Sequence, residues 1–187
     1  MRTDMIHFNI RVILLALLFQ ALCSVTAFAR PDLNQLSKSV VRISCPNGSG
    51  TGFVVTSDGY IVTNNHVMDG SVPCRVLFPE QSSGPVARLI STDADVDISI
   101  IKISRTGLTP VKLASEVPGI GDEVWALGYP GIADVVGNAL TPSVTSGPFQ
   151  RSFNGPMPFS GVRAEIIQHN AAVNPGNSGG PTFDQCG

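Results

Sequence analysis

Three short segments contain residues whose types together suit nucleophilic catalysis. "TNNHV" contains His66, "DADVDISIIKI" contains Asp97, and "NPGNSGGP" contains Ser178. A serine hydroxyl is a poor nucleophile at neutral pH, so a neighbouring imidazole must accept its proton as it attacks. A carboxylate bound to the other ring nitrogen fixes the imidazole tautomer and stabilises its charged form. The three segments therefore supply a nucleophile, a base and an orienting acid.

Each segment by itself has a simpler interpretation. A histidine after a strand is often a hydrogen-bonded turn residue, and an aspartate before an apolar strand is usually a turn or capping residue. A serine among glycines is often only a turn. The joint interpretation rests on finding all three groups in one β-rich chain, in the order His, Asp, Ser that is known from one established triad.

The glycines around Ser178 suit the same chemistry. Acyl transfer develops negative charge on a carbonyl oxygen, and hydrogen-bond donors already aimed at that oxygen stabilise it. The backbone N–H groups of Gly176 and Ser178 supply two such donors if the loop presents both inward. Gly176 permits an unusual backbone conformation and Pro175 stiffens the approach to it.

Apolar runs of four to eight residues, separated by turn residues, predict an all-β fold. The clearest hairpin is "GFVVTSDGYIVTNNHV", in which Ser57-Asp58-Gly59 connects two strands. No long amphipathic helix is expected. Further strands are expected in "PVARLIST", "ISIIKI", "DEVWALGY", "LTPSVTSG" and "RAEIIQH".

A polar segment rich in Gly and Pro, at about residues 104–120, separates two strand-rich halves. We therefore expect two small β units, residues 30–112 with His66 and Asp97 and residues 113–187 with Ser178. Closure into barrels or sandwiches removes the exposed strand edges that promote aggregation.

Residues 1–29 are typical of a signal peptide. Two arginines precede the apolar run "VILLALLFQALCSV", and "AFA" provides small residues for cleavage after Ala29. A membrane anchor is the alternative, but the run is short for a span of about 20 residues. We expect an exported protein, periplasmic or secreted, with no stable membrane anchor after cleavage.

Export to an oxidising compartment changes how the cysteines are interpreted. Cys45 ends the apolar run "VVRISC" and Cys74 begins "CRVLF"; if these two strands are neighbours, a bridge would close the loop that carries His66. Two unpaired buried thiols are the alternative. Cys186 is left over in either case.

Composition argues against several other classes of function. The net charge of -2 gives no basic footprint for nucleic acid. The run "NGSGTG" is not followed by Gly-Lys-Ser/Thr, so it does not fit a phosphate-binding loop. His66 and His169 have no Cys or His at ligand spacing, so no metal site is expected.

Five blocks in order resemble the trypsin-like serine peptidases of the HtrA (Deg) type: "GSGTGFVVTSDGYIVTNNHV", "DADVDISIIKI", "GDEVWALGYP", "VTSG" and "IIQHNAAVNPGNSGGP". The resemblance extends from about Val40 to Pro181. It implies a double antiparallel β-barrel with the active site between the barrels. It also implies a serine endopeptidase of exported or misfolded proteins that requires no cofactor and assembles as a homotrimer.

Carried over to this sequence, the resemblance makes His66 the general base, Asp97 its orienting carboxylate and Ser178 the nucleophile. Relatives activated by proteolysis have an aspartate immediately before the nucleophile, where this chain has Asn177, so no dependence on a free N-terminal amine is expected. Relatives that cut after Arg or Lys have an acidic residue six positions before the nucleophile. Ala172 stands there and favours small or medium apolar side chains. We expect His169 and Asn170 to be surface or loop residues.

Nine residues follow Ser178, and the strands that complete the second barrel in the resembling family would lie beyond them. We therefore expect the second barrel to be incomplete at the C-terminus, without the PDZ domain that is common in HtrA proteins. A truncated gene or a fragment, completion by a second protein, and a catalytically silent module that binds peptides or a partner are the interpretations left open.

Overall fold

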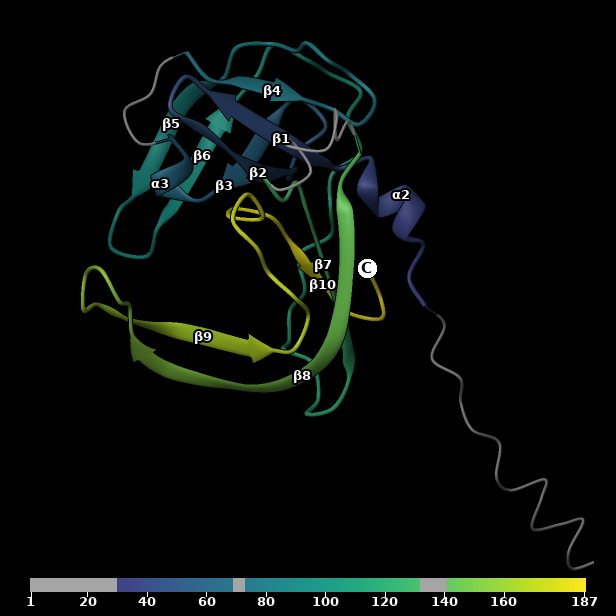
Figure 1. Cartoon of the computed structure of the whole chain (residues 1–187), viewed down its shortest axis with the longest axis vertical. Helices are drawn as coiled ribbons and strands as arrows, with labels where there is room; N and C mark the ends of the chain where they lie inside the picture. The colour runs from purple at the N-terminus through teal and green to yellow at the C-terminus, as the bar shows by residue number, and fades with distance from the viewer. Residues whose placement is uncertain (1–29, 69–72, 132–140) are drawn as a thin grey trace, which may run out of the picture.

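A computed structural model describes residues 30–68, 73–131 and 141–187, and most of the regular structure in these ranges is β-strand. Two curled antiparallel sheets account for nearly all of the regular structure (Figure 1). The expected all-β class is therefore confirmed. The expected signal peptide, residues 1–29, lies outside the described residues. Within the described ranges, no helix is both long enough and apolar enough to cross a membrane.

The first sheet has six strands in the order β4-β1-β2-β3-β6-β5. Residues just before β5 also pair with β4, because the N–H of Val76 donates to Pro85 over 3.0 Å and that of Ala87 donates to Cys74 over 2.9 Å. These bonds join the two ends of the strand order, so the sheet closes on itself. The strands are β1 (Val40–Cys45), β2 (Gly48–Val54), β3 (Tyr60–Thr63), β4 (Arg75–Leu77), β5 (Arg88–Asp93) and β6 (Ile98–Lys102).

The predicted hairpin between β2 and β3 is present. Gly59 has φ +106°, and a Cβ there would lie 2.7 Å from the carbonyl oxygen of Ile103, so the turn requires glycine. Strand β2 begins at Gly48, which places most of the "NGSGTG" run inside a strand. The core enclosed by this sheet includes the fully buried Ile43, Ile61 and Ile101. Burying each such side chain stabilises the fold by about 1.5–3 kcal/mol.

The second sheet has four strands in the order β10-β7-β8-β9. Strand β8 is 14 residues long and strongly curved; its first half pairs with β7 and its second half with β9 (Figure 1). Among the described residues, β9 and β10 each pair with one strand only, so both edges are open. This agrees with the expected incomplete second barrel. The strands are β7 (Glu123–Gly128), β8 (Ser143–Pro156), β9 (Arg163–His169) and β10 (Thr182–Phe183).

Two features of this sheet differ from the sequence prediction. The strand expected over 140–147 continues to Pro156, although Gly147 and Pro148 resemble a strand end. A Cβ at Gly147 would lie 2.5 Å from the backbone N of Ala171, so this glycine permits a close approach of another segment and does not end the strand. The short strand β10 was not predicted, because only its pairing with β7 defines it.

A shared apolar cluster joins the two sheets. Helix α2 (Leu33–Ser37) is capped by Asp32, whose carboxylate accepts from the N–H of Gln35 over 3.0 Å, and it buries Leu33. Helix α3 (Asn65–Met68) follows β3 and carries His66. The cluster consists of Leu33, Val40, Trp125, Leu127, Tyr129 and Phe183, so it draws on α2, β1, β7 and β10.

Candidate active site

The structure brings His66 and Asp97 together. The Nδ1 of His66 lies 2.7 Å from Oδ2 of Asp97, and the backbone N–H of His66 donates to Oδ1 of the same carboxylate over 2.9 Å. The Asp97 side chain is 13% exposed, whereas the His66 side chain is 57% exposed. The carboxylate thus holds the ring by one nitrogen, and most of the imidazole remains accessible.

Asp97 is held by the two residues that precede His66. Its carbonyl oxygen accepts from the Asn64 amide Nδ2 over 2.7 Å and from the backbone N–H of Asn65 over 3.1 Å. Its φ of +57° is unusual for a residue other than glycine, and these bonds compensate for the strain. Three consecutive residues therefore bind both the main chain and the side chain of Asp97. Sequence reasoning quoted Asn64 and Asn65 within their motif but gave them no role.

A hydroxyl pair extends this support. The Thr92 hydroxyl donates to Oδ1 of Asn65, and the buried Ser99 hydroxyl donates to Thr92 Oγ1 over 3.0 Å. Strands β5 and β6 flank the loop with Asp97, so this chain of bonds fixes Asn65 between them. Helix α3 begins at Asn65, so the bonds that fix Asn65 also fix the start of the helix that carries His66.

The β8–β9 hairpin reaches the same loop from the second sheet. In Figure 1 its turn extends to the connection between β5 and β6, where the Ser160 hydroxyl donates to the carbonyl of Asp95 over 2.6 Å. Asp95 is two residues from Asp97. The second sheet therefore contacts the first beside the carboxylate, at a point that the sequence did not indicate.

The loop with Ser178 has the backbone that its glycines suggested. Gly176 has φ +99°, and a Cβ there would lie 2.4 Å from the carbonyl oxygen of Tyr129. The N–H of Asn177 donates to Asn174 over 2.9 Å. Among the described residues, the N–H groups of Gly176 and Ser178 donate to no protein acceptor. The N–H groups of Gly176 and Ser178 are therefore available donors on either side of the N–H of Asn177, which is already hydrogen-bonded.

This loop docks on strand β2 of the first sheet. The carbonyl of Ser178 accepts from the N–H of Thr51 over 2.8 Å. A Cβ at Gly50 would lie 2.6 Å from Val67 and 3.1 Å from the Ser178 carbonyl oxygen, so the residue after His66 and the backbone of Ser178 both pack on Gly50. Within the described part of the chain, no hydrogen bond joins the His66 ring to the Ser178 hydroxyl.

Ala172, His169 and Asn177 occupy different environments. Ala172 is exposed, and its carbonyl accepts from the Thr145 hydroxyl over 2.7 Å. His169 ends strand β9 and so is not a loop residue; it is half-buried, with a buried Nδ1 that has no partner in the described chain. Asn170 follows the strand and is exposed, as expected. The side-chain Oδ1 of Asn177 is buried against Gly128, also without a hydrogen bond there.

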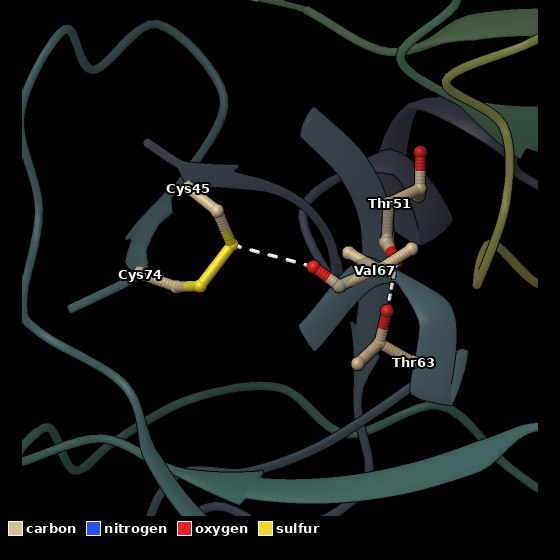
Figure 2. The surroundings of a disulfide bond; sticks show 5 residues. All are labelled: Cys45, Thr51, Thr63, Val67 and Cys74. Atoms are coloured by element: carbon tan, nitrogen blue, oxygen red, sulfur yellow. Dashed lines mark hydrogen bonds between the residues drawn. A yellow bond between two sulfur atoms is a disulfide. The ribbon is translucent and has the colours of Figure 1, made fainter. Parts of the chain in front are cut away.

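Cys45 and Cys74 form a disulfide, which is one of the two alternatives left open by the sequence. The Sγ of Cys45 lies 3.4 Å from the carbonyl oxygen of Val67, the residue after His66 (Figure 2). The bridge thus joins the end of β1 to the residue before β4, and it lies beside helix α3. Cys186 is free and exposed.

A cavity of about 940 Å³ lies at the second sheet. Neither His66, Asp97 nor Ser178 lines it. No group of three His, Cys, Asp or Glu side chains within the described ranges is placed to hold a metal ion. The segment 111–118, strands β7 to β9 and the residues after Ser178 contribute to its walls, which include Val117, Val124, Phe149, Ile167 and Phe183.

The sequence model of the trypsin-like peptidase domain matches residues 50–187. The chain therefore belongs to the trypsin-like peptidase family. Its curated relatives are of the HtrA (Deg) type. A probable periplasmic serine endoprotease DegP-like from Pseudomonas savastanoi pv. phaseolicola is 36% identical over 148 residues, which cover 74% of this chain and 27% of the relative. Protease Do-like 1, chloroplastic, from Arabidopsis thaliana is 34% identical over 149 residues, covering 78% and 32%.

Solved structures agree with this assignment. The inactive form of the Rv3671c protease superposes with a TM-score of 0.71 at 30% identity, covering 83% of this chain and 77% of that one. The HtrA-type protease AlgW with tripeptide gives a TM-score of 0.71 at 27% identity, covering 82% and 49%. The chain spans about a quarter to a third of the length of these curated relatives.

Proposed function

We propose that this chain is a serine endopeptidase in which Ser178 is the nucleophile, His66 the general base and Asp97 the orienting carboxylate. The observation that carries the proposal is the Asp97 carboxylate bound to both the ring Nδ1 and the backbone N–H of His66. The packing of Val67 and the Ser178 backbone on the same glycine supports it. Membership of the trypsin-like peptidase family supports the reaction class.

In this mechanism the Ser178 hydroxyl attacks a peptide carbonyl and passes its proton to His66 Nε2. The imidazolium is stabilised by Asp97, while the N–H groups of Gly176 and Ser178 bind the oxyanion. Collapse of the tetrahedral intermediate breaks the C–N bond, and His66 returns the proton to the leaving amine. Water then hydrolyses the acyl-enzyme by the same route. No cofactor takes part.

Labelling with a fluorophosphonate, together with a peptidase assay, tests the assignment. Ser178→Ala is expected to abolish labelling and to lower kcat by about 10⁶-fold, because the covalent step has no other nucleophile. Ser152→Ala, which alters another serine of the second sheet, is the matched control and should label normally. Labelling that persists in Ser178→Ala would assign the nucleophile to another residue.

Substrate preference and activation follow from two neighbours of Ser178. The uncharged Ala172 favours small or medium apolar side chains over Arg or Lys. The neutral side chain of Asn177 offers no charge for a free terminal amine, so an extended N-terminus should leave the activity intact. Cleavage profiling of a peptide library tests the first point, and strong cleavage after Arg or Lys would refute it.

The natural substrates that we propose are exported or misfolded polypeptides. The Cys45–Cys74 disulfide fits a location outside the cytoplasm, where such bonds persist. The names of the two relatives above place them in the periplasm and the chloroplast. Assembly as a homotrimer stays a prediction from the family resemblance, and light scattering after gel filtration tests it.

A catalytically silent module that binds peptides is the second candidate. It is favoured by the missing hydrogen bond between His66 and Ser178 in the described chain and by the two open edges of the second sheet. In many active peptidases, however, this bond is long before substrate binds. A folded protein that binds a peptide but does not react with the fluorophosphonate would favour the silent module.

A further inference from the structure

We propose that Thr51 is the positioning residue that fixes the nucleophile loop against the barrel that carries His66. This inference rests on the proposed function of Ser178. Thr51 lies in the middle of β2 and is 0% exposed. It belongs to the first sheet, yet most of its hydrogen bonds go to the second half of the chain.

Both the backbone N–H and the side-chain hydroxyl of Thr51 form hydrogen bonds with the loop that contains Ser178. Its N–H donates to the carbonyl of Ser178 over 2.8 Å, and its hydroxyl donates to the carbonyl of Gly176 over 2.7 Å. The same hydroxyl oxygen accepts from the N–H of Tyr129 over 2.9 Å. Thr51 therefore binds the carbonyls of the two residues whose N–H groups are the candidate oxyanion donors.

The first sheet holds Thr51 in turn. The Thr63 hydroxyl donates to the Thr51 carbonyl over 2.7 Å, and Figure 2 draws this bond together with Val67 and the disulfide. The fit around it is close, because a Cβ at Gly179 would lie 2.3 Å from the Thr51 carbonyl oxygen and one at Gly180 would lie 3.0 Å from its Cγ2. A β-branched side chain has few rotamers, so the hydroxyl is oriented before the loop docks.

Removing the side-chain hydroxyl of Thr51 tests this positioning role most directly. Thr51→Val keeps the shape and the strand propensity but leaves the Gly176 carbonyl and the buried Tyr129 N–H without a partner. The backbone bond from residue 51 to Ser178 persists, so the loop should shift without unfolding. A misplacement of about 1 Å at a reacting group lowers a rate by about 10²-fold.

The test compares wild type, Thr51→Val, Thr51→Ser and Ser39→Ala. Ser39 is the matched control because its buried hydroxyl also donates to a backbone carbonyl, that of Thr109, far from the loop. We expect Thr51→Val to lower kcat and the rate of fluorophosphonate labelling by about 10²-fold with little change in KM. Thr51→Ser should restore most of the rate, and Ser39→Ala should leave it unchanged.

Hydrogen exchange measured on the peptide 174–181 separates this inference from the proposed function. Exchange in that peptide should become faster in Thr51→Val and stay unchanged in Ser39→Ala, whether or not the protein hydrolyses peptides. If wild type does not react with the fluorophosphonate but the exchange pattern is as expected, the proposed peptidase activity is overturned and the positioning role of Thr51 stands. A Thr51→Val protein with wild-type exchange and labelling overturns the role of Thr51, as does an equal loss of rate in Ser39→Ala.

Discussion

The two sheets of this protein differ in how they are completed. The first closes on itself through the bonds between β4 and the residues before β5, and it encloses a core of fully buried side chains. The second has open edges at β9 and β10, and Phe153 and Ile167 are 40% and 44% exposed. The proposed base and its carboxylate belong to the closed sheet, whereas the proposed nucleophile belongs to the open one.

The loop with Ser178 is tied to both sheets. On its own side the N–H of Gly131 donates to the Pro175 carbonyl over 2.8 Å, and across the interface the loop contacts Thr51 and Gly50 of the closed sheet. The apolar cluster of α2, β1, β7 and β10 provides the remaining support. The closed sheet therefore carries His66 and Asp97 and also contacts the loop with Ser178.

The largest effect that we expect in the closed sheet is on catalysis. Asp97→Asn should lower kcat by about 10⁴-fold, because an amide nitrogen at Oδ2 cannot accept the Nδ1 proton and the ring adopts the wrong tautomer. Asp95→Asn, in the same loop, is the control and should keep its rate. Steady-state kinetics on a peptide substrate measure both. Equal rates for Asp97→Asn and wild type would remove Asp97 from the proposed mechanism.

The next largest effect that we expect is the loss of stability of the closed sheet when the Cys45–Cys74 disulfide is removed. The bridge spans a sequence separation of 29 residues, and a crosslink of that length stabilises a fold by about 3–4 kcal/mol in the chain-entropy treatment. The double variant Cys45→Ala/Cys74→Ala should lose that amount in urea unfolding. Cys186→Ala, which removes the free thiol, should not. A reductant that destabilises the double variant as much as wild type would contradict this assignment.

A matched pair of isoleucines compares the two cores directly. Ile101 on β6 is 0% exposed and Ile167 on β9 is 44% exposed. Ile101→Ala should lower the free energy of unfolding by about 3 kcal/mol, since it leaves a cavity in a packed core. Ile167→Ala should lower it by about 1 kcal/mol or less. Urea denaturation measures both, and equal losses would show that the open sheet has a core as well packed as that of the closed one.

Much of the fold follows from local sequence patterns. The β2–β3 hairpin was predicted from two apolar runs around a turn whose glycine must adopt positive φ, and the structure has φ +106° at Gly59. The curved strand β8 was predicted to end at Gly147, but the strand continues to Pro156 and this glycine makes room for Ala171. Strand β10 depends on a partner far away in sequence, so no local pattern indicates it.

For the site, the sequence alone determined which chemical groups are available: an imidazole, a carboxylate, a hydroxyl and a glycine-rich loop around it. Their types and their glycine spacing are local properties of the chain. Tertiary structure alone decided that Asn64 and Asn65 bind the Asp97 backbone and that Cys45 pairs with Cys74. It also placed the Thr51 hydroxyl on the carbonyl of Gly176, 125 residues away. Such contacts form when distant segments pack together, and a hydroxyl or an amide has the same local sequence pattern whether or not it finds a partner.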